Sequence, residues 1–157
     1  MLLPVTALAL DVGDTVPDLA AQDQSGHIQR LQDGRSRVLY VDFWASWCAP
    51  CMQALPALQQ LHARWRAAPS ATPFEVLTVN VDTRRQDARR VIDRLGLELP
   101  VIFDPDGLWA ERFALPAMPS GYLIGPDGRV RHVQVGYQAD AFPELERAIA
   151  SLLEEDS

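Results

Sequence analysis

The chain contains two cysteines, Cys48 and Cys51, and only two residues separate them in the segment WCAPC. They follow a continuous apolar run at residues 37–45, which predicts a buried strand, and they open a helix predicted over residues 49–67. The first N–H groups of a helix have no intrahelical partner and carry partial positive charge, so a thiol placed there has a lowered pKa. This spacing and placement predict a redox-active dithiol.

The positions of the two cysteines on the helix predict different roles for them. Cys48, at the tip, is expected to be the exposed nucleophile, and Cys51, one turn further in, is expected to be shielded and close enough to attack Cys48. Pro50 suits the first turn because its missing N–H would have no partner there. Ala49 and Pro50 add no charge and no side-chain donor, so the helix N-terminus is the main influence on the Cys48 thiolate.

Other chemistry for a cysteine pair fits this sequence less well. A zinc site needs four ligands, and His27, His62 and His132 have no ligand spacing to one another, so neither a metal nor another cofactor is expected. A purely structural disulfide across so short a loop would remove little entropy from the unfolded chain. A peroxidase would need a threonine where Ala45 stands, and a thioredoxin-like copper carrier would space its cysteines by three residues.

The composition is that of one soluble globular domain. The chain has 157 residues, of which 48% are hydrophobic and 22% are charged. All 14 basic residues are arginines, and the net charge of −7 argues against a nucleic-acid partner. Arginines gather between residues 84 and 94, but acidic residues alternate with them, which indicates a solvated helix face.

Two interpretations of the N-terminus stay open. Residues 2–10 form an apolar run that is too short to span a bilayer and contains the cleavage-like motif Ala7-Leu8-Ala9, but it lacks basic residues. Residues 1–10 are therefore either the remnant of an export signal or an arm that packs on the domain formed by residues 11–157. The first interpretation predicts a periplasmic or otherwise exported protein, and a cytoplasmic location is the alternative.

The remaining hydrophobic pattern predicts strands that alternate with helices. The segments 18–22 and 27–31 form a predicted hairpin around Ser25 and Gly26, strands are predicted at 74–82, 100–104, 120–125 and 129–136, and helices are predicted at 84–95, around 109–113 and at 140–153. This order is typical of an α/β fold with a central mixed sheet and helices on both faces.

Three features together resemble the thioredoxin superfamily, and within it the exported TlpA/ResA-like branch. These are the segment VDFWASWCAPC, the proline at Pro56 and the downstream segment MPSGYLIGPDGRV, and the likeness extends from about Val16 to the last predicted helix. It implies a thioredoxin fold, in which helices flank a central mixed sheet, with an N-terminal β-hairpin and an inserted βα unit. It also implies thiol–disulfide exchange, usually the reduction of partner proteins outside the cytoplasm, including those of cytochrome c maturation.

The resemblance gives roles to residues around the cysteines. Pro119 matches the cis-proline of the family, and Met118 before it would offer its backbone N–H and C=O to an extended substrate segment. Trp47 would cover the thiols and shape the docking surface together with Ala49 and Pro50. These five residues are therefore the predicted substrate-binding set.

Asp42 lies inside the apolar run, where an acid is costly unless it has a function. Burial raises the pKa of an acid, so that it can exchange a proton near neutral pH. Thioredoxins have an aspartate here and a lysine near Thr78, whereas TlpA/ResA-like proteins more often have an asparagine here and a glutamate at the place of Thr83, next to Asp82. We predict that Asp42 is the proton shuttle, and the alternative is a hydrogen-bonded structural acid.

The sequence thus predicts a reductase of protein disulfides whose catalytic residues are Cys48, Cys51 and Asp42. By resemblance, a membrane thiol transporter would reduce the enzyme again after each cycle. A thiol oxidase or disulfide isomerase, and a thioredoxin-fold binding protein or chaperone without redox turnover, are the alternatives. The physiological partner stays open, and a monomer is favoured.

Overall fold

The computed structural model describes residues 8–34 and 36–155, and a five-stranded mixed sheet lies at its centre with the strand order β5-β4-β3-β6-β7. The strands are β3 (Val38–Trp44), β4 (Phe74–Asn80), β5 (Val101–Phe103), β6 (Ser120–Ile124) and β7 (Val130–Val135). β3, β4 and β5 are parallel to one another, whereas β6 pairs antiparallel with both β3 and β7. This is the mixed central sheet that the sequence predicts.

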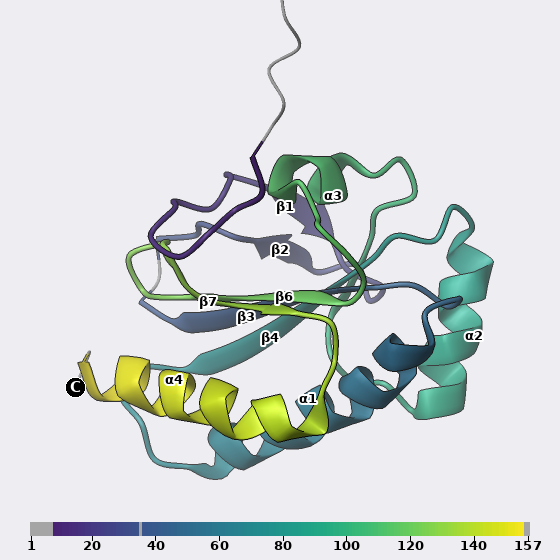
Figure 1. Ribbon diagram of the computed structural model, residues 1–157. Helices are drawn as coiled ribbons and strands as arrows, with labels where there is room; N and C mark the ends of the chain where they lie inside the picture. Colours follow the sequence, from purple (N-terminus) through teal and green to yellow (C-terminus); the bar gives the residue numbers. More distant parts are fainter. Residues whose placement is uncertain (1–7, 35, 156–157) are drawn as a thin grey trace, which may run out of the picture.

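Helices cover both faces of this sheet (Figure 1). They are α1 (Ala49–Ala67), α2 (Arg85–Leu95), α3 (Leu108–Phe113) and α4 (Phe142–Glu155), with a short 3-10 helix at Ala139–Ala141 before α4. In Figure 1, α1 and α4 lie below the sheet and α3 lies above it, next to the predicted hairpin. That hairpin consists of β1 (Ala20–Gln22) and β2 (Ile28–Arg30), which pair antiparallel.

The central strand β3 contributes side chains to two separate cores. Every residue of β3 is buried, and alternate residues point to opposite faces of the sheet. Val38, Tyr40 and Trp44 belong to the core that also contains residues of α1, α2 and α4. Leu39, Val41 and Phe43 belong to the core around α3 and the hairpin. Burial on both faces explains why β3 reads as a continuous apolar run rather than an alternating one.

The segment before β1 packs against the domain. Leu10 contacts the core around α3. The N–H groups of Gly13 and Val16 donate hydrogen bonds to the carbonyl oxygens of Val130 and Gly128, at 2.8 and 3.0 Å. Most of the predicted signal remnant, residues 1–7, lies outside the described residues.

The arginine-rich helix α2 ends at Gly96, as its sequence predicts. Gly96 has the left-handed backbone conformation (φ 59°, ψ 42°) that glycine adopts without strain, and it closes the helix through hydrogen bonds to the last turn. On the exposed side of the helix, Arg84 and Arg90 form ion pairs with Asp87 at 3.0 and 3.2 Å. The charged stretch is therefore a solvated, locally paired helix face.

Candidate active site

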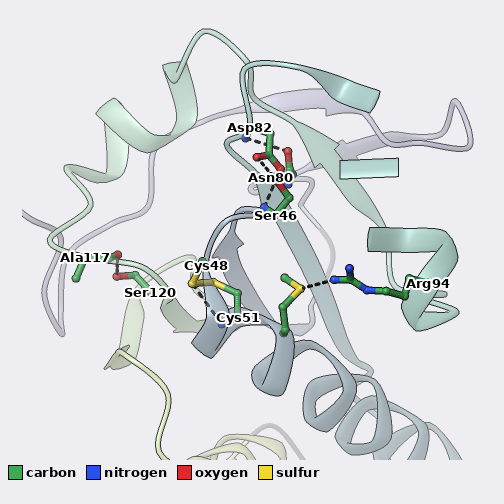
Figure 2. The surroundings of a disulfide bond; sticks show 9 residues. Ser46, Cys48, Cys51, Asn80, Asp82, Arg94, Ala117 and Ser120 are labelled. Atoms are coloured by element: carbon green, nitrogen blue, oxygen red, sulfur yellow. Dashed lines mark hydrogen bonds between the residues drawn. A yellow bond between two sulfur atoms is a disulfide. The ribbon is translucent and has the colours of Figure 1, made fainter. Parts of the chain in front are cut away.

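A disulfide joins the two cysteines at the N-terminus of α1 (Figure 2), with their Cα atoms 5.3 Å apart. Cys48 is the N-cap residue of the helix, and its Sγ accepts a hydrogen bond from the Cys51 backbone N–H at 3.3 Å. Pro50 occupies the first turn, where no N–H is needed. The sulfur that would carry the thiolate thus receives a helix N-terminal N–H group, which favours negative charge on it.

Cys48 is less accessible than the sequence predicts. Its exposed fraction is 5%, compared with 0% for Cys51. The prediction of an exposed Cys48 is therefore wrong for the disulfide form, because Cys48 packs in the same core as Trp44 and Ala45 while its sulfur is bonded to Cys51. Cys48 is nevertheless the more accessible of the two cysteines, as predicted, because it keeps a small exposed surface and Cys51 keeps none.

The loop before β6 also reaches the cysteines. Met118 is half-buried and packs against the core that contains both of them. The Met118–Pro119 peptide bond is cis, and Pro119 is buried. Figure 2 shows this loop beside the disulfide, where the Ser120 hydroxyl donates a hydrogen bond to the Ala117 carbonyl at 2.7 Å. The fold thus brings the predicted substrate-pairing residues to the cysteine pair.

The residues that flank the cysteines in the sequence form an exposed rim. The Trp47 side chain is 69% exposed, and Ala49 and Pro50 are exposed as well. Trp44, in contrast, is fully buried and donates its indole N–H to the Thr78 hydroxyl at 3.1 Å. A large exposed aromatic side chain next to a reactive pair is typical of a docking surface.

Asp42 lies in the middle of β3 and is 3% exposed, on the face that carries Tyr40 and Trp44. Its neighbours in register are Thr78 on β4 and Gly121 on β6, and neither carries a charge. Among the described residues, its Oδ2 atom has no hydrogen-bond partner. Burial raises the pKa of Asp42 well above its usual range. A buried acid with an unpartnered oxygen is costly to the fold, which favours a functional reason for its presence.

A second buried acid, Asp82, has a structural role that the sequence prediction does not assign to it. Its carboxylate accepts hydrogen bonds from the backbone N–H and the hydroxyl of Ser46, at 2.9 and 2.8 Å, and from the Asn80 side-chain amide at 2.8 Å (Figure 2). Ser46 lies two residues before Cys48, so Asp82 holds the loop that connects β3 to α1. A signal for this contact was present, because an acid after one parallel strand lies close to the end of the neighbouring strand.

The central mixed sheet, the cysteine pair at a helix N-terminus and the proline loop beside it define a thioredoxin-like redox centre. Residues 12–133 match the sequence model of the AhpC/TSA family, and the chain belongs to that family.

Proteins with similar sequences are named as thiol-disulfide oxidoreductases or thioredoxin-like proteins. Thiol-disulfide oxidoreductase ResA from Geobacillus kaustophilus (strain HTA426) is 28% identical over 144 residues, which cover 92% of this chain and 79% of the relative. Thioredoxin-like protein YneN from Bacillus subtilis is 26% identical over 132 residues, which cover 82% of this chain and 74% of the relative.

A solved structure gives the same result. A protein from Chlorobium tepidum, assigned as the thiol:disulfide interchange protein DsbE, matches with a TM-score of 0.84 at 35% identity, over 92% of this chain and 99% of that one. The predicted resemblance to ResA-like proteins is confirmed, and this chain is a thiol–disulfide oxidoreductase.

The contacts of Asp82 give a testable prediction. We expect Asp82→Ala to lower the free energy of unfolding by about 1–3 kcal/mol, because buried donors on Ser46 and Asn80 lose their acceptor. Urea unfolding with the disulfide intact measures this change. Asp93→Ala, which removes an exposed carboxylate on α2, is the control and should stay within about 0.5 kcal/mol of the unchanged protein. Equal losses in the two variants would contradict the role of Asp82 in holding the loop.

Proposed function

We propose that this protein reduces disulfide bonds of partner proteins through the Cys48–Cys51 dithiol. The observation that carries the proposal is the position of Cys48 as N-cap of α1, with its sulfur accepting the Cys51 N–H. The thiolate form of Cys48 is favoured there, and a thiolate is the nucleophile of thiol–disulfide exchange. Cys51 is fully buried, and so it is placed to react with Cys48 rather than with a partner.

The proposed cycle starts from the reduced protein. The Cys48 thiolate attacks one sulfur of the partner disulfide, a mixed disulfide forms, and the second partner sulfur leaves as a thiolate. The Asp42 carboxylate takes the proton of the Cys51 thiol. The Cys51 thiolate then attacks the Cys48 sulfur, which closes the Cys48–Cys51 disulfide and releases the partner as a dithiol. The disulfide in the structure corresponds to the end of this cycle.

The partner would dock as an extended segment on the rim around the cysteines. The exposed Trp47, with Ala49 and Pro50, supplies apolar contact area for that segment. The backbone N–H and C=O of Met118, before Pro119, would pair with the segment as an added strand does. Because this pairing recognises the partner's backbone rather than its side chains, it suits a reductase that acts on disulfides in different sequence contexts.

Resemblance to ResA-like proteins supports three further parts of the proposal. The protein works in the periplasm or otherwise outside the cytoplasm, a membrane thiol transporter reduces it again, and apoproteins of cytochrome c maturation are among its substrates. Residues 1–10 would then be the rest of an export signal and residues 11–157 the working domain, as a monomer that does not bind nucleic acid. Over residues 8–34 and 36–155, none of the helices combines the length and the apolar character needed to cross a membrane.

The roles of the two cysteines predict which variant traps partners. Cys51→Ser should accumulate mixed disulfides on Cys48, because no second thiol resolves them. Cys48→Ser should accumulate about tenfold fewer, because Cys51 is fully buried. Non-reducing gels after rapid alkylation would measure the adducts, with the double serine variant as the blank. Equal trapping by both single variants would refute the assignment of roles.

The direction of electron flow is a second prediction. Between the cysteines, Ala49 and Pro50 offer no charge and no side-chain donor, and Asp42 disfavours additional negative charge nearby, so the dithiol form is weakly stabilised. We expect a reduction potential close to the roughly −270 mV of thioredoxin and far below the roughly −120 mV of the oxidant DsbA. Equilibration in glutathione buffers, followed by tryptophan fluorescence, gives the midpoint. A midpoint more oxidising than the glutathione couple would instead favour the oxidase or isomerase alternative.

The buried Asp42 predicts how stability depends on pH. Its pKa in the folded protein is raised by burial, so the native state binds more protons than the unfolded chain between the ordinary and the raised value. The contribution of Asp42 to stability should therefore be largest below the ordinary pKa of aspartate and should be lost as the pH rises through the raised value. At a pH above the raised pKa, the lost stability amounts to about 1.4 kcal/mol for each pH unit by which burial raises the pKa.

Asp42→Asn should remove this decline and slow the resolution of mixed disulfides, because the base is gone. Urea unfolding of the disulfide form between pH 4 and pH 9, on the order of ten conditions, would measure the decline. Asp93→Asn on the surface of α2 is the matched control and should keep the pH dependence of the unchanged protein. A decline of the same size in Asp42→Asn would show that Asp42 does not titrate as proposed.

A further inference from the structure

Tyr40 lies two residues before Asp42 on β3, and so on the same face of the sheet. It is 3% exposed and belongs to the core that contains both cysteines. Its side chain extends sideways over β6, where Gly121 leaves room for it. A Cβ atom built on Gly121 would overlap the Tyr40 hydroxyl oxygen and ring. The hydroxyl of Tyr40 thus fills the place where a side chain at position 121 would begin.

That place is beside Asp42. Gly121 is the residue directly opposite Asp42 in the antiparallel pair of β3 and β6. Residues directly opposite each other in such a pair have Cβ atoms about 4.5–5.5 Å apart. Since the Tyr40 hydroxyl overlaps the Cβ position of Gly121, it lies on the same face of the sheet as the Asp42 side chain and near it. The two groups also interact electrostatically, because the charge of Asp42 adds to burial in raising the pKa of Tyr40.

On the other side of Asp42, the hydroxyl of Thr78 already makes two hydrogen bonds. The Thr78 hydroxyl accepts the indole N–H of Trp44 at 3.1 Å and donates its own proton to the Pro100 carbonyl at 3.0 Å. It therefore has no proton left for a charge on Asp42, whose Oδ2 has no hydrogen-bond partner among the described residues. Of these two hydroxyls, that of Tyr40 is the one able to donate to the carboxylate.

Among the described residues, few other titratable groups lie on the elements packed around Asp42. The two cysteines at the N-terminus of α1 belong to the core that contains Tyr40, and α2 and α4 present apolar side chains to this core. On β7, His132 lies opposite Leu123, which in turn lies opposite Tyr40, so it is two strands away from β3. At the end of β4, the Asp82 carboxylate already accepts three hydrogen bonds. On β6, Tyr122 belongs to the opposite core.

We propose that the Tyr40 hydroxyl donates a hydrogen bond to the Asp42 carboxylate, directly or through one water molecule, and so positions the base that deprotonates Cys51. This inference rests on the proposed role of Asp42. The proton of the Cys51 thiol moves to Asp42, while the Tyr40 proton stays on its own oxygen throughout. An ion in an apolar core is strongly disfavoured without a donor, so the hydroxyl makes the ionised form of Asp42 available for the resolving step.

Tyr40→Phe tests the proposal, because it keeps the ring and removes the hydroxyl. In the reduced variant, the titration midpoint of the Asp42 carboxyl, followed by carbon NMR of labelled aspartate, should rise by about one pH unit, since the carboxylate loses a donor. The pH profile of mixed-disulfide resolution should move to higher pH by the same amount, and the rate should recover at high pH. Circular dichroism confirms that the variant is folded.

Two matched variants complete the experiment. Tyr122→Phe removes another buried hydroxyl, from the opposite core, and should leave the Asp42 midpoint unchanged. His132→Gln should also leave it unchanged. An unshifted midpoint in Tyr40→Phe, or equal shifts in the two tyrosine variants, would overturn the hydrogen bond. A wild-type rate of resolution in Asp42→Asn would instead overturn the role of Asp42 itself, and with it the part of Tyr40 in that step.

Discussion

The burial of β3 on both faces is the constraint on which the rest of the structure depends. A strand covered on both faces is shielded from bulk water, so leaving a polar group on it without a hydrogen-bond partner is costly. Asp42 stands in the middle of this strand, between Thr78 and Gly121. The chemistry of the site follows from this position, because burial away from water raises the pKa of Asp42 well above its usual range.

The same strand leads directly to the cysteines. Where β3 ends, the chain turns into α1, and the backbone N–H of Cys51 in the first turn of the helix donates a hydrogen bond to the Cys48 sulfur. Two other parts of the chain fix this turn: Asp82 at the end of β4 binds Ser46, and the loop with Met118 packs against the cysteine core. Contacts from β4 and from the loop before β6 thus hold the turn that carries the reactive sulfur, while Trp47 next to it stays exposed.

Local patterns predicted the elements of this site well but not its side-chain contacts. The helix at 49–67 and the turn at Gly96 follow from signals within a few residues, and so their bounds agree with the structure. The low exposure of Cys48 depends on neighbours brought in by packing, which no local pattern contains. The direction of the Tyr40 side chain depends on strand register, although a glycine inside a strand, such as Gly121, is itself a sign that another group approaches closely.

The space next to Gly121 on β6 is occupied by the Tyr40 side chain of β3. Because Tyr40 fills it, residues 40 and 121 share a single volume and cannot vary independently. An alanine at position 121 would need a smaller residue at position 40, and a much smaller residue at position 40 would leave a destabilising void next to Gly121. Among related chains, these two positions are therefore expected to change together. Either residue 40 or residue 121 would supply the side chain that lies next to the buried acid.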